Sequence, residues 1–153
     1  MVIRSATLDD IDRCIELLTC LFGQEAEFSP DPVRQRKGLL MIVQDPSRGN
    51  VFVVEDQKRK VITGMAVLLY TVSTALGSKV ALLEDLVIDP GYRSQGIGTQ
   101  LINYAIRFAE NEGFARITLL TDEDNGTAHH FYQKQGFSRS DMIVFRRINS
   151  LVR

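Results

Sequence analysis

The segment from Leu82 to Gly98 constrains the fold of this chain more than any other stretch. It reads LLEDLVIDPGYRSQGIG, an apolar and β-branched run followed by a Pro-Gly turn and then by Gly96 and Gly98 at the start of a helical pattern. Glycines let backbone N–H groups come close to a ligand because they carry no Cβ. The N-terminal amides and the positive dipole end of the following helix point to the same place. The segment therefore predicts a strand-loop-helix unit that binds a phosphate or a diphosphate.

Two common phosphate-binding loops do not match this segment. A Walker A loop requires Lys and Ser or Thr after its second glycine, and here Ile97 and Gly98 follow Gly96. The dinucleotide fingerprint G-x-G-x-x-G would require a glycine where this chain has Leu101. We therefore expect neither a nucleoside-triphosphate hydrolase nor a nicotinamide-dependent dehydrogenase.

The pattern that remains is R-x-x-G-x-G, and a second motif follows it along the chain. The first motif consists of Arg93, Ser94, Gln95, Gly96, Ile97 and Gly98. The second is NGTAHHFYQKQGF, from Asn125 to Phe137. In this order and separation, the two motifs resemble those of the GCN5-related N-acetyltransferase superfamily. With the strand before the loop, the resemblance spans Ala81 to Phe137.

The resemblance implies that acetyl-coenzyme A is the co-substrate and that no metal takes part. The loop from Arg93 to Gly98 would then bind the pyrophosphate. In such proteins the preceding strand splays from its parallel neighbour, and its backbone binds the pantetheine arm. By position, these backbone groups belong to Leu86, Val87 and Ile88. Asn125 would bind the same arm, although helix capping alone would explain an asparagine there.

The same resemblance suggests residues for proton transfer. Tyr132 takes the place of the tyrosine that protonates the coenzyme A thiolate, and a phenol carries its proton at neutral pH. Glu84 stands nine residues before Arg93, where some small-amine acetyltransferases carry a glutamate that acts as general base. Asp85 is the next residue, so alternation along a strand predicts that only one of the two carboxylates faces a given cleft. We expect Asp85 to form a structural ion pair.

Periodicity and turn residues predict the order β-α-α-β-β-β-α-β-α-β. Thr7 and Asp10 form a capping-box-like start for the first helix, and Pro32 suits the first position of the second helix. The expected fold is an α/β sandwich, the acyl-CoA N-acyltransferase fold, with a mixed and mostly antiparallel sheet, a splayed parallel strand pair and helices on both faces. The predicted strands span Val2–Arg4, Asn50–Glu55, Val61–Val72, Val80–Ile88, Ala115–Leu120 and Met142–Ile148, and the third helix spans about Gly96–Glu112.

Composition and length limit the remaining possibilities. A chain of 153 residues with a net charge of −1 predicts one soluble domain over residues 1–153 that binds neither nucleic acid nor membrane. Its N-terminal residues turn acidic early, so we expect a cytoplasmic protein. Cys14 and Cys20 lie on roughly opposite faces of one predicted helix, which favours two half-buried thiols over a disulfide. His129 and His130 are adjacent in a helix, and this geometry favours a solvated pair over a metal site.

The function expected from these features is acetyl transfer from acetyl-coenzyme A to a primary amine, by direct attack in a ternary complex. The acceptor is expected to be a small molecule. Two alternatives remain open, a protein lysine or N-terminal acetyltransferase and a coenzyme A-binding regulatory module without turnover. The acidic segment with Glu25, Glu27 and Asp31 would attract a cationic amine, but a solvated loop is the expected state. The C-terminal strand, with Arg146 and Arg147, would either pair with a second copy in a homodimer or form an ordinary edge.

Overall fold

The computed structural model describes residues 1–25 and 28–150 of the chain. The chain forms two compact units, residues 1–120 and residues 121–153, and each is described by itself. The prediction that residues 1–153 form a single domain stays a prediction. The elements are β1 (Val2–Ser5), α1 (Ile11–Phe22), α2 (Pro32–Val43), β2 (Gly49–Asp56), β3 (Val61–Ser73), β4 (Ser78–Ile88), α3 (Ile97–Asn111), β5 (Ile117–Leu119) and α4 (Gly126–Lys134).

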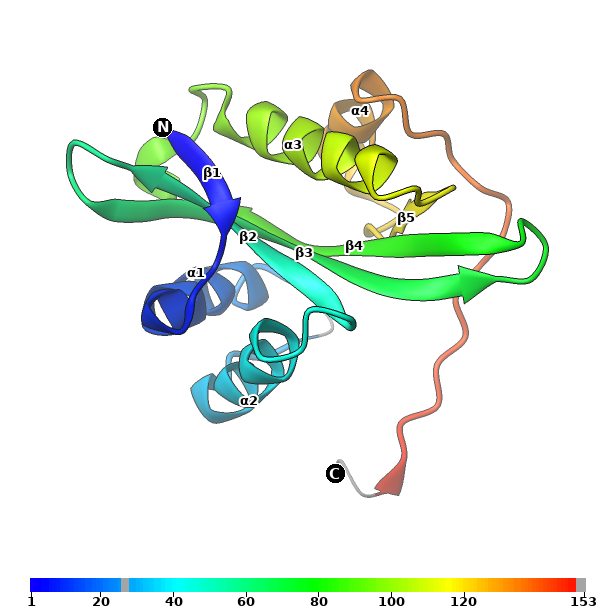
Figure 1. Ribbon diagram of the computed structural model, residues 1–153, viewed down its shortest axis with the longest axis horizontal. Helices are drawn as coiled ribbons and strands as arrows, with labels where there is room; N and C mark the ends of the chain where they lie inside the picture. The colour runs from blue at the N-terminus through cyan, green and yellow to red at the C-terminus, as the bar shows by residue number, and fades with distance from the viewer. Residues whose placement is uncertain (26–27, 151–153) are drawn as a thin grey trace. The chain divides into compact units, whose positions relative to one another are not determined.

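The first unit contains one five-stranded mixed sheet with the strand order β1-β2-β3-β4-β5 (Figure 1). Its first four strands pair antiparallel, in agreement with the mixed and mostly antiparallel sheet expected from the sequence. β5 pairs parallel to β4, which confirms the parallel arrangement expected for a strand-helix-strand connection. The observed strands begin and end within two residues of the predicted limits, apart from the last predicted strand.

Helices cover both faces of this sheet, α1 and α2 on one side and α3 on the other (Figure 1). Side chains alternate along each strand, so neighbouring residues serve different faces. Met65 and Val67 are buried in the cluster that contains Leu17 and Cys14 of α1. Phe52 is fully buried and lies edge-on to the rings of two α3 residues, Tyr104 at 5.4 Å and Phe108 at 5.1 Å between ring centroids. These two apolar layers hold the sheet between its helices.

Both N-terminal helices begin as the sequence predicts. The Asp10 carboxylate accepts a hydrogen bond from the Thr7 backbone N–H at 2.7 Å and caps a 3-10 turn that leads into α1. Asp31 is the N-cap of α2, where its carboxylate accepts from the Arg34 N–H at 3.1 Å, and Pro32 occupies the first helical position. Gly38 lies inside α2 without ending it. These local signals were sufficient to locate the helices.

The second unit contains α4, and its last described segment is not a strand. The prediction of a strand over Met142–Ile148 is wrong, because these residues are in neither a helix nor a strand. Met142 and Phe145 are each 88% exposed. Alternation of apolar residues gives strand propensity, but a strand also needs a partner for its backbone, and the described residues of this unit contain no strand. Pairing of this segment with a second copy stays a prediction.

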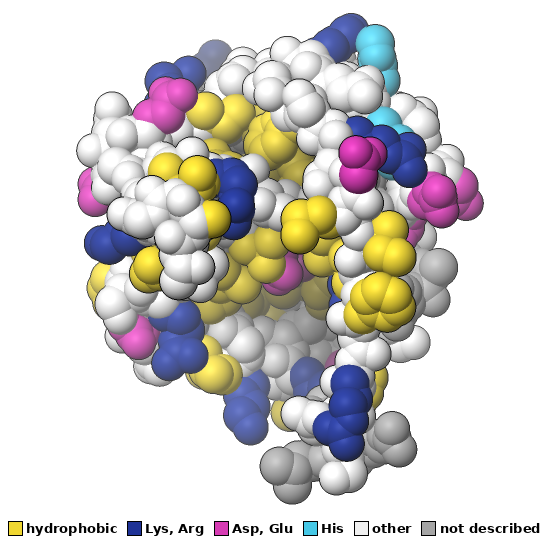
Figure 2. All heavy atoms as spheres, turned by 90° about the vertical axis from the view of Figure 1, so that its right-hand side faces the viewer, with side chains coloured by type: hydrophobic (Ala, Val, Ile, Leu, Met, Phe, Trp, Pro, Cys, Tyr) yellow, Lys and Arg dark blue, Asp and Glu magenta, His cyan; other side chains and the backbone are white. Residues whose placement is uncertain are grey.

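The surface carries side chains of both charges. Figure 2 shows both Lys or Arg and Asp or Glu side chains on the face that it presents, as a net charge near zero predicts. Within the described residues, no helix combines the length and the hydropathy that crossing a membrane requires.

Candidate active site

β4 carries one extra residue opposite β3, and this bulge shapes the site. Glu84 pairs with Val67 and Val87 pairs with Met65, so three residue steps on β4 oppose two on β3. Asp85 lies at the bulge with a φ of 53°, in the left-handed region that non-glycine residues seldom adopt. The bulge therefore breaks the alternation of side chains along the strand.

β4 also extends beyond its parallel partner. Pairing with β5 ends at Leu83 and Leu119, whereas β4 continues to Ile88. In the part of the chain that the structure describes, no strand pairs with this edge of β4 after Leu83. This edge includes Leu86, Val87 and Ile88, the residues predicted to bind pantetheine through their backbone. The Ile88 carbonyl already accepts a hydrogen bond from Arg93 Nε at 3.1 Å.

The loop after β4 brings open backbone N–H groups to the N-terminus of α3. Ser94 and Gly96 both have positive φ, 63° and 77°. Gly96 is the N-cap of α3 and has no side chain to bind the first amides of the helix. The Gln100 N–H donates to the Gly96 carbonyl at 3.1 Å, so the N–H groups before it have no intrahelical acceptor. These amides, together with the positive end of the helix dipole, fit a diphosphate.

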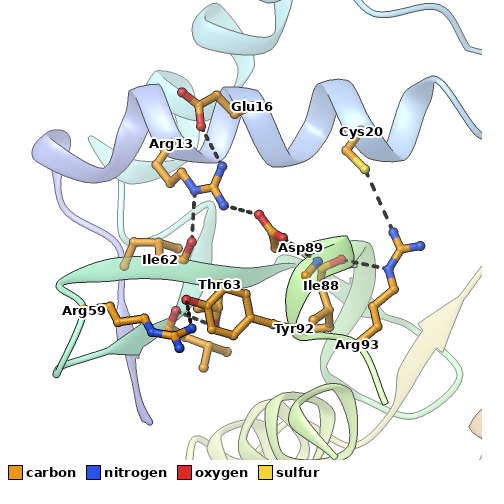
Figure 3. A network of polar contacts seen from close by, with 12 residues as sticks. Arg13, Glu16, Cys20, Arg59, Ile62, Thr63, Ile88, Asp89, Tyr92 and Arg93 are labelled. Carbon is orange, nitrogen blue, oxygen red and sulfur yellow. Dashed lines mark hydrogen bonds and ion pairs between the residues drawn. The ribbon is translucent and has the colours of Figure 1, made fainter. Parts of the chain in front are cut away.

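A polar network anchors the start of this loop to α1 and β3 (Figure 3). The Asp89 carboxylate accepts a hydrogen bond from the Gly91 N–H at 2.8 Å and a second from Arg13 Nη2. Arg13 also donates from Nε to the Ile62 carbonyl at 3.0 Å and from Nη1 to Glu16 at 2.6 Å. The hydrogen bond from Gly91, followed by the hydrogen bond and the charge of Arg13, lowers the pKa of Asp89. The role of Arg13 was not predicted from the sequence, because there it is only one charged residue on an amphipathic helix.

Arg93 contributes to this network through its side chain. Its guanidinium donates to the Ile88 carbonyl and, from Nη2, to the Cys20 sulfur at 3.9 Å, so Arg93 joins the end of β4 to α1 (Figure 3). The two cysteines differ in burial. Cys14 is buried completely, which corrects the prediction of two half-buried thiols, and this burial raises the pKa of Cys14 to about 12. Cys20 is half-buried.

A cavity of about 580 Å³ lies among α1, α2, the segment between them and β4. It is lined by apolar and polar side chains, Leu18, Phe22, Phe28, Ser29, Pro30, Asp31, Arg34, Gln35, Gly38, Leu39, Ile42, Glu84 and Asp85. The rings of Phe22 and Phe28 lie 5.7 Å apart. The cavity therefore combines an apolar wall with carboxylates from two elements.

Glu84 and Asp85 both line this cavity, and two predictions about them are wrong. They do not face opposite sides, because the bulge at Asp85 breaks the alternation. Asp85 also has no ion pair among residues 1–25 and 28–150, where a structural pair was expected. Burial of the carboxyl group, then the charge of Glu84 and then that of Glu25, raise the pKa of Asp85 to about 7. The site thus contains a carboxyl group that titrates near neutral pH.

Two carboxylates of the acidic segment before α2 lie among the described residues. Asp31 lines the cavity and caps α2, and Glu25 is half-buried. Glu27 lies outside the described residues. Gln35, which sequence analysis did not single out, is buried and donates from Nε2 to the Ile15 carbonyl at 3.1 Å and to Thr19 Oγ1 at 3.0 Å.

The remaining predicted site residues lie in the unit formed by residues 121–153. The Asn125 side chain accepts from the Ala128 N–H at 3.1 Å, so this asparagine caps α4. Tyr132 lies on α4, with its ring 5.3 Å from that of Phe131 and 6.0 Å from that of Phe137. The roles predicted for Asn125 towards pantetheine and for Tyr132 as general acid stay predictions.

The histidines of α4 do not form a metal site with other described residues. The His129 ring Nε2 forms a hydrogen bond with the Asp122 carbonyl at 2.8 Å, and His130 is exposed. Within the described residues, no three His, Cys, Asp or Glu side chains are grouped so that they could hold a metal ion.

Comparison of this chain with models of known protein families shows which family it belongs to. The model of the acetyltransferase (GNAT) family matches residues 11–137, most of the chain. The chain belongs to the GNAT family. The resemblance carried by the two sequence motifs is thereby confirmed, and the fold of this GNAT protein is the one that the resemblance implied.

Individual relatives support the same assignment. An uncharacterized N-acetyltransferase from Methanocaldococcus jannaschii is 26% identical over 141 residues, 92% of this chain and 62% of its own length. The GNAT chain thus spans less than two thirds of that archaeal relative. An aminoalkylphosphonate N-acetyltransferase from Salmonella typhimurium is 27% identical over 90% of this chain and 85% of its own length. A solved structure of a possible acetyltransferase from Clostridium difficile shares the fold, with a TM-score of 0.87, 19% identity and 97% coverage of both chains.

Proposed function

We propose that this GNAT protein transfers the acetyl group of acetyl-coenzyme A to the primary amine of a small molecule. The observation that carries the proposal is the arrangement of two features around β4, both within residues 1–120. The open amides of the loop at Gly96 follow the strand, and the cavity with Glu84 and Asp85 lies at its bulge. One feature suits a diphosphate and the other a cationic amine, as this reaction requires.

In the proposed reaction, each group of residues has its own role. The amides of residues 94–98 bind the diphosphate of acetyl-coenzyme A, and the unpaired edge of β4 from Leu86 to Ile88 binds the extended arm like an added strand. The carboxylates of the cavity hold the amine and take its proton, so that the nitrogen lone pair attacks the thioester carbonyl. Tyr132 returns a proton to the thiolate. Asn125 binds the pantetheine amides in addition to capping α4.

The size and lining of the cavity favour a small acceptor over a protein lysine or an N-terminus. A volume of about 580 Å³ lies within the range of small-molecule sites, and its apolar wall suits the carbon skeleton of an amine. The Salmonella relative is named for a small acceptor with an amino group, an aminoalkylphosphonate. We therefore place small primary amines first among the acceptor classes.

The test is transfer by the purified chain with acetyl-coenzyme A and matched acceptor panels. One panel holds small primary amines, and the other holds peptides with a lysine or a free N-terminus. Thiol release and product mass report transfer, and coenzyme A binding is measured separately. We expect acetylated small amines, with a slower reaction in the Tyr132→Phe variant. Products from peptides alone would support the protein acetyltransferase, and binding without any product would support the regulatory module.

A further inference from the structure

Asp85 occupies a conformation and a position that an ordinary strand residue would not. Its φ of 53° lies in a region that residues with a Cβ seldom adopt, and residues held in such conformations cluster at functional sites. The extra residue in β4 turns Asp85 into the cavity that Glu84 also lines. The strain thus coincides with the placement of a second carboxyl group in the acceptor cavity.

Within the part of the chain that the structure describes, no cation forms an ion pair with Asp85. No hydrogen bond or ion pair of its carboxyl group occurs among the described residues. Glu84 on the same strand and Glu25 after α1 both oppose its ionisation. From α2, Asp31 and Arg34 line the cavity, but they form an ion pair with each other at 3.4 Å. The α1 side chains in the cavity wall are apolar. A cationic ligand is therefore the partner that this carboxyl group lacks.

We propose that Asp85, rather than Glu84, takes the proton from the ammonium form of the acceptor, while Glu84 holds that cation in the cavity. This inference rests on the proposed function. In the step, the N–H bond of the ammonium breaks, and its proton passes to the Asp85 carboxylate. The freed lone pair forms the C–N bond of the acetamide, and the C–S bond of the thioester breaks. The departing thiolate takes a proton from a separate acid, for which Tyr132 is the candidate. The nitrogen, once joined to the acetyl carbon, loses its second proton to that deprotonated acid, and the proton on Asp85 leaves to solvent.

The charge environment suits this role. A general base works best when its pKa lies near the pH at which the protein operates. Burial, Glu84 and Glu25 raise the pKa of Asp85 to about 7, and the arriving ammonium favours the ionised form. Asp85 is therefore ionised when it meets the amine, and its raised pKa makes it a better proton acceptor than a carboxylate with an ordinary pKa.

The experiment compares Asp85→Asn with Glu84→Gln, two substitutions that preserve side-chain shape. Asparagine tolerates a positive φ, so the bulge is retained, and melting temperature and coenzyme A binding verify the fold of both variants. kcat and KM are measured from pH 5 to pH 10 with one amine from the small-molecule panel. A second acceptor is a fluorinated analogue, in which a nearby C–F bond lowers the pKa of the amine.

We expect the wild-type kcat/KM to rise with pH through a limb that Asp85→Asn removes. In that variant, kcat falls by about 100-fold or more, the usual contribution of a general base. The loss is smaller for the fluorinated amine, which needs less help to lose its proton. Glu84→Gln is expected to raise KM and to keep the pH limb.

Two results would overturn the inference. A pH limb that persists in Asp85→Asn and disappears in Glu84→Gln would assign the proton to Glu84. An equal loss with both amines in Asp85→Asn would mean that Asp85 acts only through structure. Failure of the wild-type chain to acetylate any amine, with coenzyme A still bound, would instead overturn the proposed function, and this inference with it.

Discussion

The guanidinium of Arg13 on α1 is bonded to the carboxylate of Asp89, the residue that begins the loop after β4. The same carboxylate accepts the Gly91 N–H at 2.8 Å. Arg13 also reaches the Ile62 carbonyl on β3. One half-buried side chain therefore connects the first helix, the sheet and the start of the loop after β4.

Arg13→Met is expected to lower the stability of the fold and to weaken coenzyme A binding. Loss of charged hydrogen bonds from a half-buried site costs about 1–3 kcal/mol. The pKa of Asp89 is lowered by Gly91 and then by Arg13, so the stability that this carboxylate contributes is present above its ordinary pKa and is lost as the pH falls further. Urea unfolding should show a larger effect at pH 7 than at pH 3.

The control for Arg13 is Arg107→Met, at an exposed position of α3. This change should leave stability nearly unchanged at both pH values. Equal destabilisation by the two substitutions would contradict the anchoring role of Arg13.

Gly96→Ala and Gly38→Ala are expected to change stability in opposite directions. Gly96 has a φ of 77°, and a Cβ there would meet nothing within 4 Å, so the cost is conformational and about 1–2 kcal/mol. Gly38 lies within α2 with equally open space and an ordinary helical φ, so alanine there should add about 0.5–1 kcal/mol. Thermal unfolding measures the stability of both variants. Calorimetry with coenzyme A should show weaker binding for Gly96→Ala alone. A stabilised Gly96→Ala variant would contradict the conformational cost expected for alanine at this positive φ.

Local signals predicted most of the fold, whereas contacts between distant segments escaped prediction. Helix periodicity, Pro32 at the start of α2 and the glycines of the loop act within a few residues, so their structures could be inferred from the sequence. The bulge at Asp85 depends on how β4 pairs with β3, and a register shift leaves no local signature. Arg13 and Asp89 are 76 positions apart. The failure of the strand predicted at Met142 has the same cause, because strand propensity does not supply a partner.

Gln35→Leu is expected to destabilise the pair formed by α1 and α2. The Gln35 amide donates to the Ile15 carbonyl and Thr19, and its oxygen accepts the Asp31 N–H at 2.7 Å. Leucine would leave these groups without their partner, at a cost of about 1–3 kcal/mol. Because Gln35 also lines the cavity, KM for the amine should rise.

Gln133→Leu is the matched control, because Gln133 is exposed on α4. Denaturant unfolding should separate the two variants clearly. A Gln35→Leu protein as stable as wild type would show that the buried amide contributes nothing to helix packing.

Asp85→Asn is expected to change the pH dependence of stability. The pKa of Asp85 is about 7 in the folded protein, raised by burial, by Glu84 and by Glu25, against about 4 in an unfolded chain. Between these values the folded protein holds a proton that the unfolded chain has released, so rising pH disfavours the folded state. Asparagine carries no such proton. The stability of the Asp85→Asn variant relative to wild type should therefore increase by about 2 kcal/mol between pH 5 and pH 8.

The control is Glu110→Gln, on the exposed face of α3, which should show no comparable change. Urea unfolding at the two pH values tests this, and parallel stability curves for wild type and Asp85→Asn would mean that Asp85 keeps an ordinary pKa.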